Sequence, residues 1–175
     1  MDRRKFMKLT FSGLASSAAW PALAQTNKAR METPEDIVRW IYAEAVKKEK
    51  DGSQKGGTIF GGKGPIRRLF SVAFLREWDA AQARIKKSGD LGLDFDPVSN
   101  SQDPSIGKVE FKIENESAGK TRVAATFGSL EDPKAAPQTV RYDFVREGNA
   151  WKLDDIAGSV EKDPWSLRGL MKEWK

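Results

Sequence analysis

The sequence predicts an α+β protein, in which helices come first and an antiparallel sheet follows. Two observations lead to this prediction. Apolar residues recur at the spacing of a helical face over residues 33–50 and 65–88, and over residues 109–153 they alternate with polar residues, as in strands with one buried face. A run of helices followed by a run of strands is typical of domains whose helices pack on one face of a sheet. We therefore expect N-terminal helices on an antiparallel sheet of at least four strands.

The first predicted helix begins at Thr33, whose side chain can cap it, and Pro34 suits the first helical position. It ends near Lys50. Residues 51–64 follow and contain six glycines, which predict an irregular loop. The spacing of these glycines approaches that of a phosphate-binding loop, but Gly64 occupies the position that requires Ser or Thr. We therefore expect a loop without a phosphate site.

A second helical stretch covers residues 65–88, with a break near Ser71, which can cap a new helix start. It stops at Ser88 and Gly89. The C-terminal tail, residues 163–175, can form a short last helix. Four apolar residues would share one side of that helix: Leu167, Leu170, Met171 and Trp174.

Four strands are predicted between the second helical stretch and the tail. Alternating apolar residues mark them at 109–113, 123–127, 140–144 and 151–153, with turns through residues 116–119 and 147–149. The apolar faces of the helices and strands together predict the core. Its expected members are Ile37, Ile41, Phe74, Trp78, Phe111, Val123, Phe127, Tyr142, Phe144, Trp151 and Leu153.

The N-terminus resembles a twin-arginine export signal. Arg3 and Arg4 precede Phe6, and an uncharged, mildly apolar run follows. The run ends on Ala22 and Ala24, which form the small-x-small site that a signal peptidase can cleave. It falls short of the ~20 apolar residues that a membrane span needs. We therefore expect a removable signal, a periplasmic protein and no lasting membrane anchor.

This signal departs from the twin-arginine pattern at Asp2 and Met7, so an ordinary secretory signal with a chance arginine pair is the alternative. The resulting division of the chain is an export signal over residues 1–24, a short leader over 25–32, and one α+β domain over 33–175 that contains the Gly-rich loop at 51–64.

The composition excludes several classes of site. The chain has neither Cys nor His, which excludes zinc sites built from these residues, Cys-ligated iron–sulfur clusters, and Ser-His or Cys-His catalysis. We therefore expect no cofactor. Removing residues 1–24 leaves 26 basic and 24 acidic residues, so the net charge falls from +5 to +2. Such a small charge gives no support to nucleic-acid binding.

Two segments stand out, DFDPVSNSQD at 94–103 and WKLDDI at 151–156. They are the best local signals of a resemblance that spans most of residues 33–172. In these segments the chain resembles an uncharacterised family of bacterial exported domains, related to the nuclear transport factor 2 and ketosteroid-isomerase-like (cystatin-like) superfamily. It implies a cone-like fold, in which a strongly curved sheet wraps around helices and leaves a pocket. The superfamily includes isomerases, dehydratases, hydrolases and inert binding modules, so the fold alone does not give the function.

The stretch LDFDPVSNSQD, residues 93–103, could be a metal loop, a catalytic cluster or a turn. It departs from the helix–loop–helix calcium motif, because Val98 stands where an oxygen ligand is needed. Leu91, Leu93 and Phe95 alternate as in a short strand, which Pro97 would end. The sequence therefore predicts a strand and a capped turn near the mouth of the pocket. Its polar residues would mainly hold the backbone: Asp94, Asp96, Asn100, Gln102 and Asp103.

Three functions are compatible with these residues. The first is a non-catalytic binding or interaction module, whose partner is a small molecule or a periplasmic protein. The second is an isomerase- or dehydratase-type enzyme with an Asp general base and a Tyr or Trp donor, and the third is a calcium-binding envelope protein. The candidate bases are Asp94, Asp96, Asp103 and Asp155, and the candidate tyrosine donors are Tyr42 and Tyr142. An enzyme requires one of these carboxylates to face an enclosed cavity.

A regular strand would point Asp155 into the core together with Trp151 and Leu153. Burying a carboxylate there is costly unless it is paired. We therefore expect a β-bulge that returns Ile156 to the core. The arginines that could otherwise pair with an inward acid are Arg67, Arg68, Arg76 and Arg122.

Overall fold

The computed structural model describes residues 33–50 and 65–175. The predicted signal residues, Arg3, Arg4, Phe6, Ala22 and Ala24, lie outside the described residues, as do the leader at 25–32 and the Gly-rich loop at 51–64. Within the described part of the chain, no helix has both the length and the apolar character needed to span a bilayer.

The helices begin and end where their capping residues predict. Helix α1 spans Pro34–Lys50, and the Thr33 hydroxyl accepts a hydrogen bond from the Asp36 amide at 3.1 Å. Helices α2 (Pro65–Leu69) and α3 (Val72–Ser88) are separated at Ser71, whose hydroxyl accepts from the Phe74 amide at 3.0 Å. This confirms the predicted break, because Ser71 satisfies an amide that the new helix leaves unpaired.

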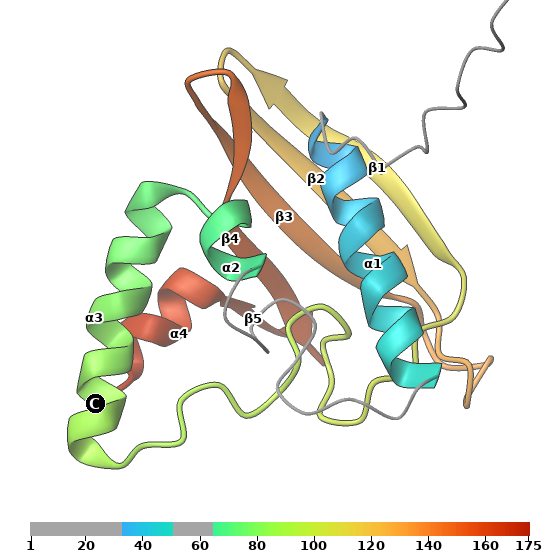
Figure 1. Ribbon diagram of the computed structural model, residues 1–175. Helices are drawn as coiled ribbons and strands as arrows, with labels where there is room; N and C mark the ends of the chain where they lie inside the picture. The colour runs from blue at the N-terminus through green and yellow to red at the C-terminus, as the bar shows by residue number, and fades with distance from the viewer. Residues whose placement is uncertain (1–32, 51–64) are drawn as a thin grey trace, which may run out of the picture.

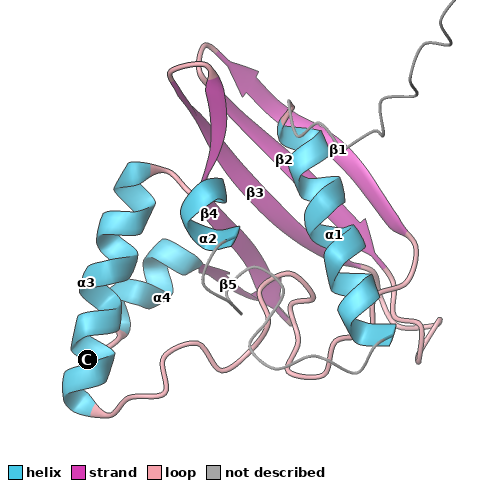
Figure 2. Ribbon diagram, in the orientation of Figure 1, coloured by secondary structure: helices cyan, strands magenta, loops and turns pink. Residues whose placement is uncertain are grey.

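A five-stranded antiparallel sheet follows, with its strands in sequence order. Figure 2 shows the strands and helices by type. The strands are β1 (Val109–Ser117), β2 (Lys120–Phe127), β3 (Gln138–Glu147), β4 (Ala150–Val160) and β5 (Asp163–Ser166), and helix α4 (Leu167–Glu173) closes the described chain. The four predicted strands are confirmed. The fifth was expected to be helical, but its residues pair with β4, and the helix begins only after Ser166.

All described helices lie on one face of the sheet: α1 crosses β1 and β2, while α3 and α4 lie beside β4 (Figure 1). The sheet is open and is not strongly curled, so the strong curvature expected from the family resemblance is not found. Strong bending of a sheet needs bulges or glycine kinks. The central pair, β2 and β3, keeps an unbroken register from Lys120–Val145 to Phe127–Gln138, so it provides no such bend.

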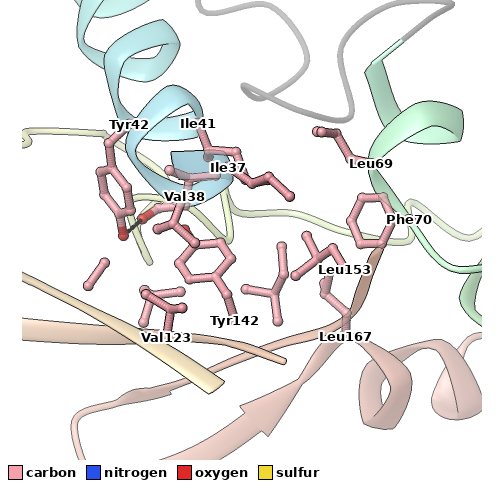
Figure 3. Packing of buried hydrophobic residues seen from close by; sticks show 14 of the residues in the cluster. Ile37, Val38, Ile41, Tyr42, Leu69, Phe70, Val123, Tyr142, Leu153 and Leu167 are labelled. Carbon is pink, nitrogen blue, oxygen red and sulfur yellow. Dashed lines mark hydrogen bonds between the residues drawn. The ribbon is translucent and has the colours of Figure 1, made fainter. Parts of the chain in front are cut away.

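The core lies between the helices and the covered face of the sheet. Val38 of α1 lies above Tyr142 of β3, and Phe70 lies against Leu153 of β4 (Figure 3). All predicted core residues are buried except three, which are partly buried and pack against the core: Trp78, Phe111 and Trp151. The predicted apolar side of the last helix is also inward, with Leu167 and Met171 of α4 and Trp174 directly after it buried.

Candidate functional site

The stretch at residues 93–103 forms a turn rather than a strand followed by a turn. The Asp96 amide donates to the Ser101 carbonyl at 2.9 Å, and this isolated bridge replaces the strand expected over residues 91–95. One carboxylate oxygen of Asp96 accepts a hydrogen bond from the Val98 amide at 2.9 Å. Asp96 therefore holds the local backbone, as Asp residues do in turns. The strand prediction is wrong, because among the described residues no strand extends the pairing beyond this bridge.

The turn at residues 97–100 is buried and closes one end of the core. The Tyr42 hydroxyl of α1 donates to the Val98 carbonyl at 3.0 Å. The Asn100 amide donates to the Gln138 side chain and to the Ser159 carbonyl, both at 2.8 Å, and its carbonyl oxygen accepts from the Trp165 indole at 2.7 Å. Asn100 thus joins the turn to β3, β4 and β5. Its positive φ of 55° is a conformation that Asn tolerates better than most residues.

The remaining polar residues of this stretch, Asp94, Gln102 and Asp103, are exposed. Within residues 33–50 and 65–175, no three side chains of the Asp, Glu, His or Cys type gather closely enough to hold a metal ion.

The predicted β-bulge is confirmed in β4. Asp155 pairs with Asp143 and Leu153 pairs with Phe144, which leaves Asp154 as the extra residue. Leu153 and Ile156 are both fully buried. The bulge therefore allows two residues three positions apart to enter the same core, and it keeps the two carboxylates out of it.

Asp154 belongs to a polar cluster that joins α3, β4 and α4. Its carboxylate accepts from the Ser71 hydroxyl at 2.5 Å and from the Arg168 guanidinium at 2.8 Å. Arg168 also donates to the Asp154 carbonyl at 2.8 Å and forms an ion pair with Glu77. Sequence reasoning missed Arg168, because a side chain in the last helix has no sequence pattern that links it to β4.

Asp155 is partly buried, and this burial raises the pKa of its carboxyl group above the ordinary 3.8, although it accepts hydrogen bonds from the Ile156 and Arg168 amides at 2.9 and 3.1 Å. Arg122 pairs with Asp143 through two hydrogen bonds of 2.6 and 2.8 Å. The start of α4 is thus the main polar partner of Asp155, and none of the arginines expected from the sequence takes that place.

One hollow among the described residues lies on the sheet face opposite the helices. We call it the open-face hollow. Its volume is about 400 Å³, and its lining residues come from β1 to β4: Asn115, Ser117, Lys120, Thr121, Arg122, Asp143, Phe144, Val145 and Asp154. The strand register places Asn115, Arg122, Asp143 and Asp155 in one row across the four strands. Within this row, Arg122 and Asp143 form an ion pair.

The second hollow lies on the helix side, where α1, α2 and the β3–β4 hairpin meet. We call it the cationic hollow. Its volume is about 370 Å³, and its lining residues are Ile37, Arg68, Leu69, Arg146, Asn149, Ala150, Trp151 and Lys152. Three of these residues are cationic (Arg68, Arg146 and Lys152), Asn149 carries an amide, and the other four are apolar. None of the lining side chains carries a carboxylate.

Contacts within the cationic hollow hold two of its cations in place. The Arg146 guanidinium carbon lies 5.4 Å from the centre of the Trp151 ring, a distance typical of a cation–π contact. The Lys152 ammonium donates to the Arg68 carbonyl at 2.6 Å, which ties β4 to α2. Trp151 is partly buried and packs against the core, so its indole ring is held firmly beside the hollow.

None of the candidate bases, Asp94, Asp96, Asp103 and Asp155, lines either hollow. The candidate donors Tyr42 and Tyr142 lie in the core, with ring centres 6.1 Å apart, and burial raises the pKa of both phenols. Both hydroxyls are therefore neutral at physiological pH.

No protein-family model, curated protein or solved structure matches this chain.

Proposed function

We propose that this protein is an exported binding module that holds a small organic anion in the cationic hollow. The observation that carries the proposal is the combination of three cations with an apolar lining and no carboxylate. Ligand sites are typically concave, largely apolar and furnished with a few polar groups that fix the ligand's orientation. An aromatic or aliphatic carboxylate of modest size has the matching chemistry.

The two arginines provide the recognition of the anionic end. A guanidinium binds a carboxylate through two parallel hydrogen bonds, and Arg146 is already oriented by the Trp151 ring. Arg68 lies on α2 and adds a second guanidinium to the lining from a different element. Lys152 has one donor engaged with the Arg68 carbonyl and adds positive charge at short range.

The apolar end of the ligand would lie against Trp151, Leu69 and Ile37. These side chains come from β4, α2 and α1, and Leu69 and Ile37 are part of the core. Ile37 and Leu69 are already almost completely buried, so the apolar surface removed from water is mainly that of Trp151 and of the ligand itself, which contributes about 25 cal/mol per Å². A wholly polar anion lacks this gain, so we expect weaker binding of sulfate or acetate.

The general-base alternative lacks comparable support. It requires a carboxylate that faces a pocket together with a hydrogen-bond donor. The candidate aspartates line neither of the two hollows, and Asp155 accepts backbone hydrogen bonds at the start of α4. A binding module needs no such carboxylate, and therefore explains more of the arrangement.

Export to the periplasm and kinship with the nuclear transport factor 2-like superfamily are part of the same proposal. The order of helices before a meander sheet, with the helices on one face, supports the kinship. The paired arginines and the Ala22–Ala24 site support export. Replacing both Arg3 and Arg4 by Lys should block export by the twin-arginine route, as measured by fractionation of cells. Unchanged export would leave the general secretory route as the alternative.

Binding can be tested by titration calorimetry and by tryptophan fluorescence. The probes are phenylbutyrate and octanoate, with phenylbutanol and octanol as uncharged controls and acetate as the control without an apolar body. We expect the two carboxylates to bind, and their affinity to fall about tenfold or more in the double variant Arg68→Gln/Arg146→Gln, because two charge-assisted hydrogen-bond donors are lost.

A matched control removes the same charge from the opposite face of the sheet. Lys120→Gln/Arg141→Gln should leave the affinity unchanged, because neither residue lines the cationic hollow. Failure of both carboxylates to bind, or equal loss of affinity in the two double variants, would contradict the proposed site.

A further inference from the structure

The outer edge of β1 is a second surface with a defined chemistry. Strand β1 pairs with β2 on one side, and within the described residues no strand pairs with its other side. It is nine residues long, contains no proline, and most of its side chains are exposed. An edge of this length presents a row of unpaired backbone amides and carbonyls, which can pair with another strand.

Charges alternate along this strand. Glu110 and Lys112 lie on the open face, where the register places them beside Thr126 and Ala124 of β2. Val109, Phe111 and Ile113 lie on the helix side, and Ile113 is 45% exposed although it is apolar. The Glu110 carboxylate lies 3.2 Å from the Lys108 ammonium, but both side chains are largely exposed. Such an ion pair is weak, so it leaves both charges available to a partner.

We propose that two copies of the protein associate through β1, antiparallel to each other, with the two-fold axis at Phe111. In this register Glu110 of each copy lies opposite Lys112 of the other, and Val109 lies opposite Ile113. Each pair occurs twice because of the symmetry. The exposed Ile113 side chain gains an apolar neighbour, and the opposite charges face each other across the new strand pair.

The neighbouring registers are disfavoured by the same charges. An axis at Glu110 would place the two Glu110 carboxylates opposite each other, and would also pair Lys108 with Lys112. An axis at Lys112 would place the two Lys112 side chains opposite each other, and would also pair Glu110 with Glu114. Charged residues often protect sheet edges from pairing. Here their alternation opposes two neighbouring registers and favours the one centred on Phe111.

The rest of the fold accommodates this arrangement. The two five-stranded sheets would join into one continuous sheet of ten strands, a size that open sheets can reach. The helices of both copies would lie on the same side, because residues that are paired across strands share a face. The register shift between Ile113 and Asn115 would end the paired segment, because a bulge turns the strand away.

Sedimentation analysis of the purified chain tests the proposal through charge reversal. We expect a dimer that dissociates about tenfold or more readily in Lys112→Glu, and likewise in Glu110→Lys, because each change places like charges opposite each other twice. The double variant Glu110→Lys/Lys112→Glu restores opposite charges and should return to within about twofold of the original dissociation constant. Lys172→Glu on α4 is the control for net charge, and should have no effect.

A cross-linking experiment locates the axis independently. The chain has no Cys, so a single introduced thiol can only pair with its own copy in the partner. Phe111→Cys should form a disulfide-linked dimer under mild oxidation, whereas Ile113→Cys should not, because residue 113 lies opposite residue 109. A chain that stays monomeric at all concentrations, a dimer that the double variant does not restore, or equal cross-linking at both positions would overturn the proposal.

Discussion

The two faces of the sheet differ although the same strands build them. On the helix side, Tyr142, Phe144 and Leu153 are almost completely buried against α1, α2 and α3. On the open side the corresponding positions carry polar groups that pair with each other across strands. These pairs are Arg122 with Asp143, Arg141 with Glu114, and Thr126 with Thr139.

This difference implies that the two faces contribute unequally to stability. Burial on the helix side removes apolar surface from water, which is the main favourable contribution to folding. The ion pairs on the open side remain partly exposed, so solvent screening reduces what they contribute. Residues of the open face can therefore change at little cost in folding free energy, whereas residues of the helix face cannot.

The largest effect is expected from a cavity on the helix side. Leu153→Ala should lower the free energy of unfolding by about 2–5 kcal/mol, because Leu153 is fully buried between Phe70 and Phe144. Val145→Ala, which changes the neighbouring strand on the open face, should cost less than about 1 kcal/mol. Urea denaturation of both variants measures the difference. Equal losses would show that the two faces contribute alike.

An intermediate effect is expected at Asn100, which closes one end of the helix side. Asn100→Ala removes three hydrogen bonds and places alanine at a positive φ, so we expect a loss of about 2 kcal/mol. Gln102→Ala changes an exposed residue of the same stretch, and should alter stability by less than about 0.5 kcal/mol. If Asn100→Ala behaved like this control, the turn would not hold the strands together.

A smaller effect is expected for the ion pair on the open face. Arg122→Met should lower the free energy of unfolding by less than about 1 kcal/mol, because both partners keep about a third of their side-chain surface in water. The loss should shrink further in high salt. Thermal denaturation at low and high ionic strength measures it, with Asp143→Asn as the matched partner variant. A loss as large as that of Leu153→Ala would contradict the proposed division between the faces.

The smallest effect should appear only as a change with pH. The pKa of Asp155 is raised in the folded protein, mainly by burial, so the folded state favours the protonated form. This stabilisation is complete below the ordinary carboxyl pKa and is lost as the pH rises through the raised value. Asp155→Asn should remove this decline, because the amide does not titrate. Its oxygen can still accept the backbone hydrogen bonds, so the local structure is kept. The free energy of unfolding is measured at several pH values from 3 to 7 in both proteins. The same dependence on pH in the variant and in the original chain would exclude a raised pKa.

Local patterns in the sequence determined most of the secondary structure. The caps at Thr33 and Ser71, the glycine after α3 and the alternation in β1 to β4 act over a few residues, so they can be recognised without knowledge of the fold. The bulge in β4 was predictable for the same reason. A regular strand would have buried Asp155, and shifting the alternation by one residue returns Ile156 to the core.

Only the tertiary structure decided which polar groups meet. Ser71 and Asp154 lie 83 positions apart, and Asn100 reaches Trp165 across 65 positions. The cationic hollow likewise combines one helix, a second helix and a hairpin. Sequence periodicity indicates which face of its own helix or strand a residue occupies. It does not indicate which other element covers that face. For this reason the sequence by itself could suggest Asp155 and the 93–103 stretch, whereas Arg68, Arg146 and Lys152 came together only in the folded chain.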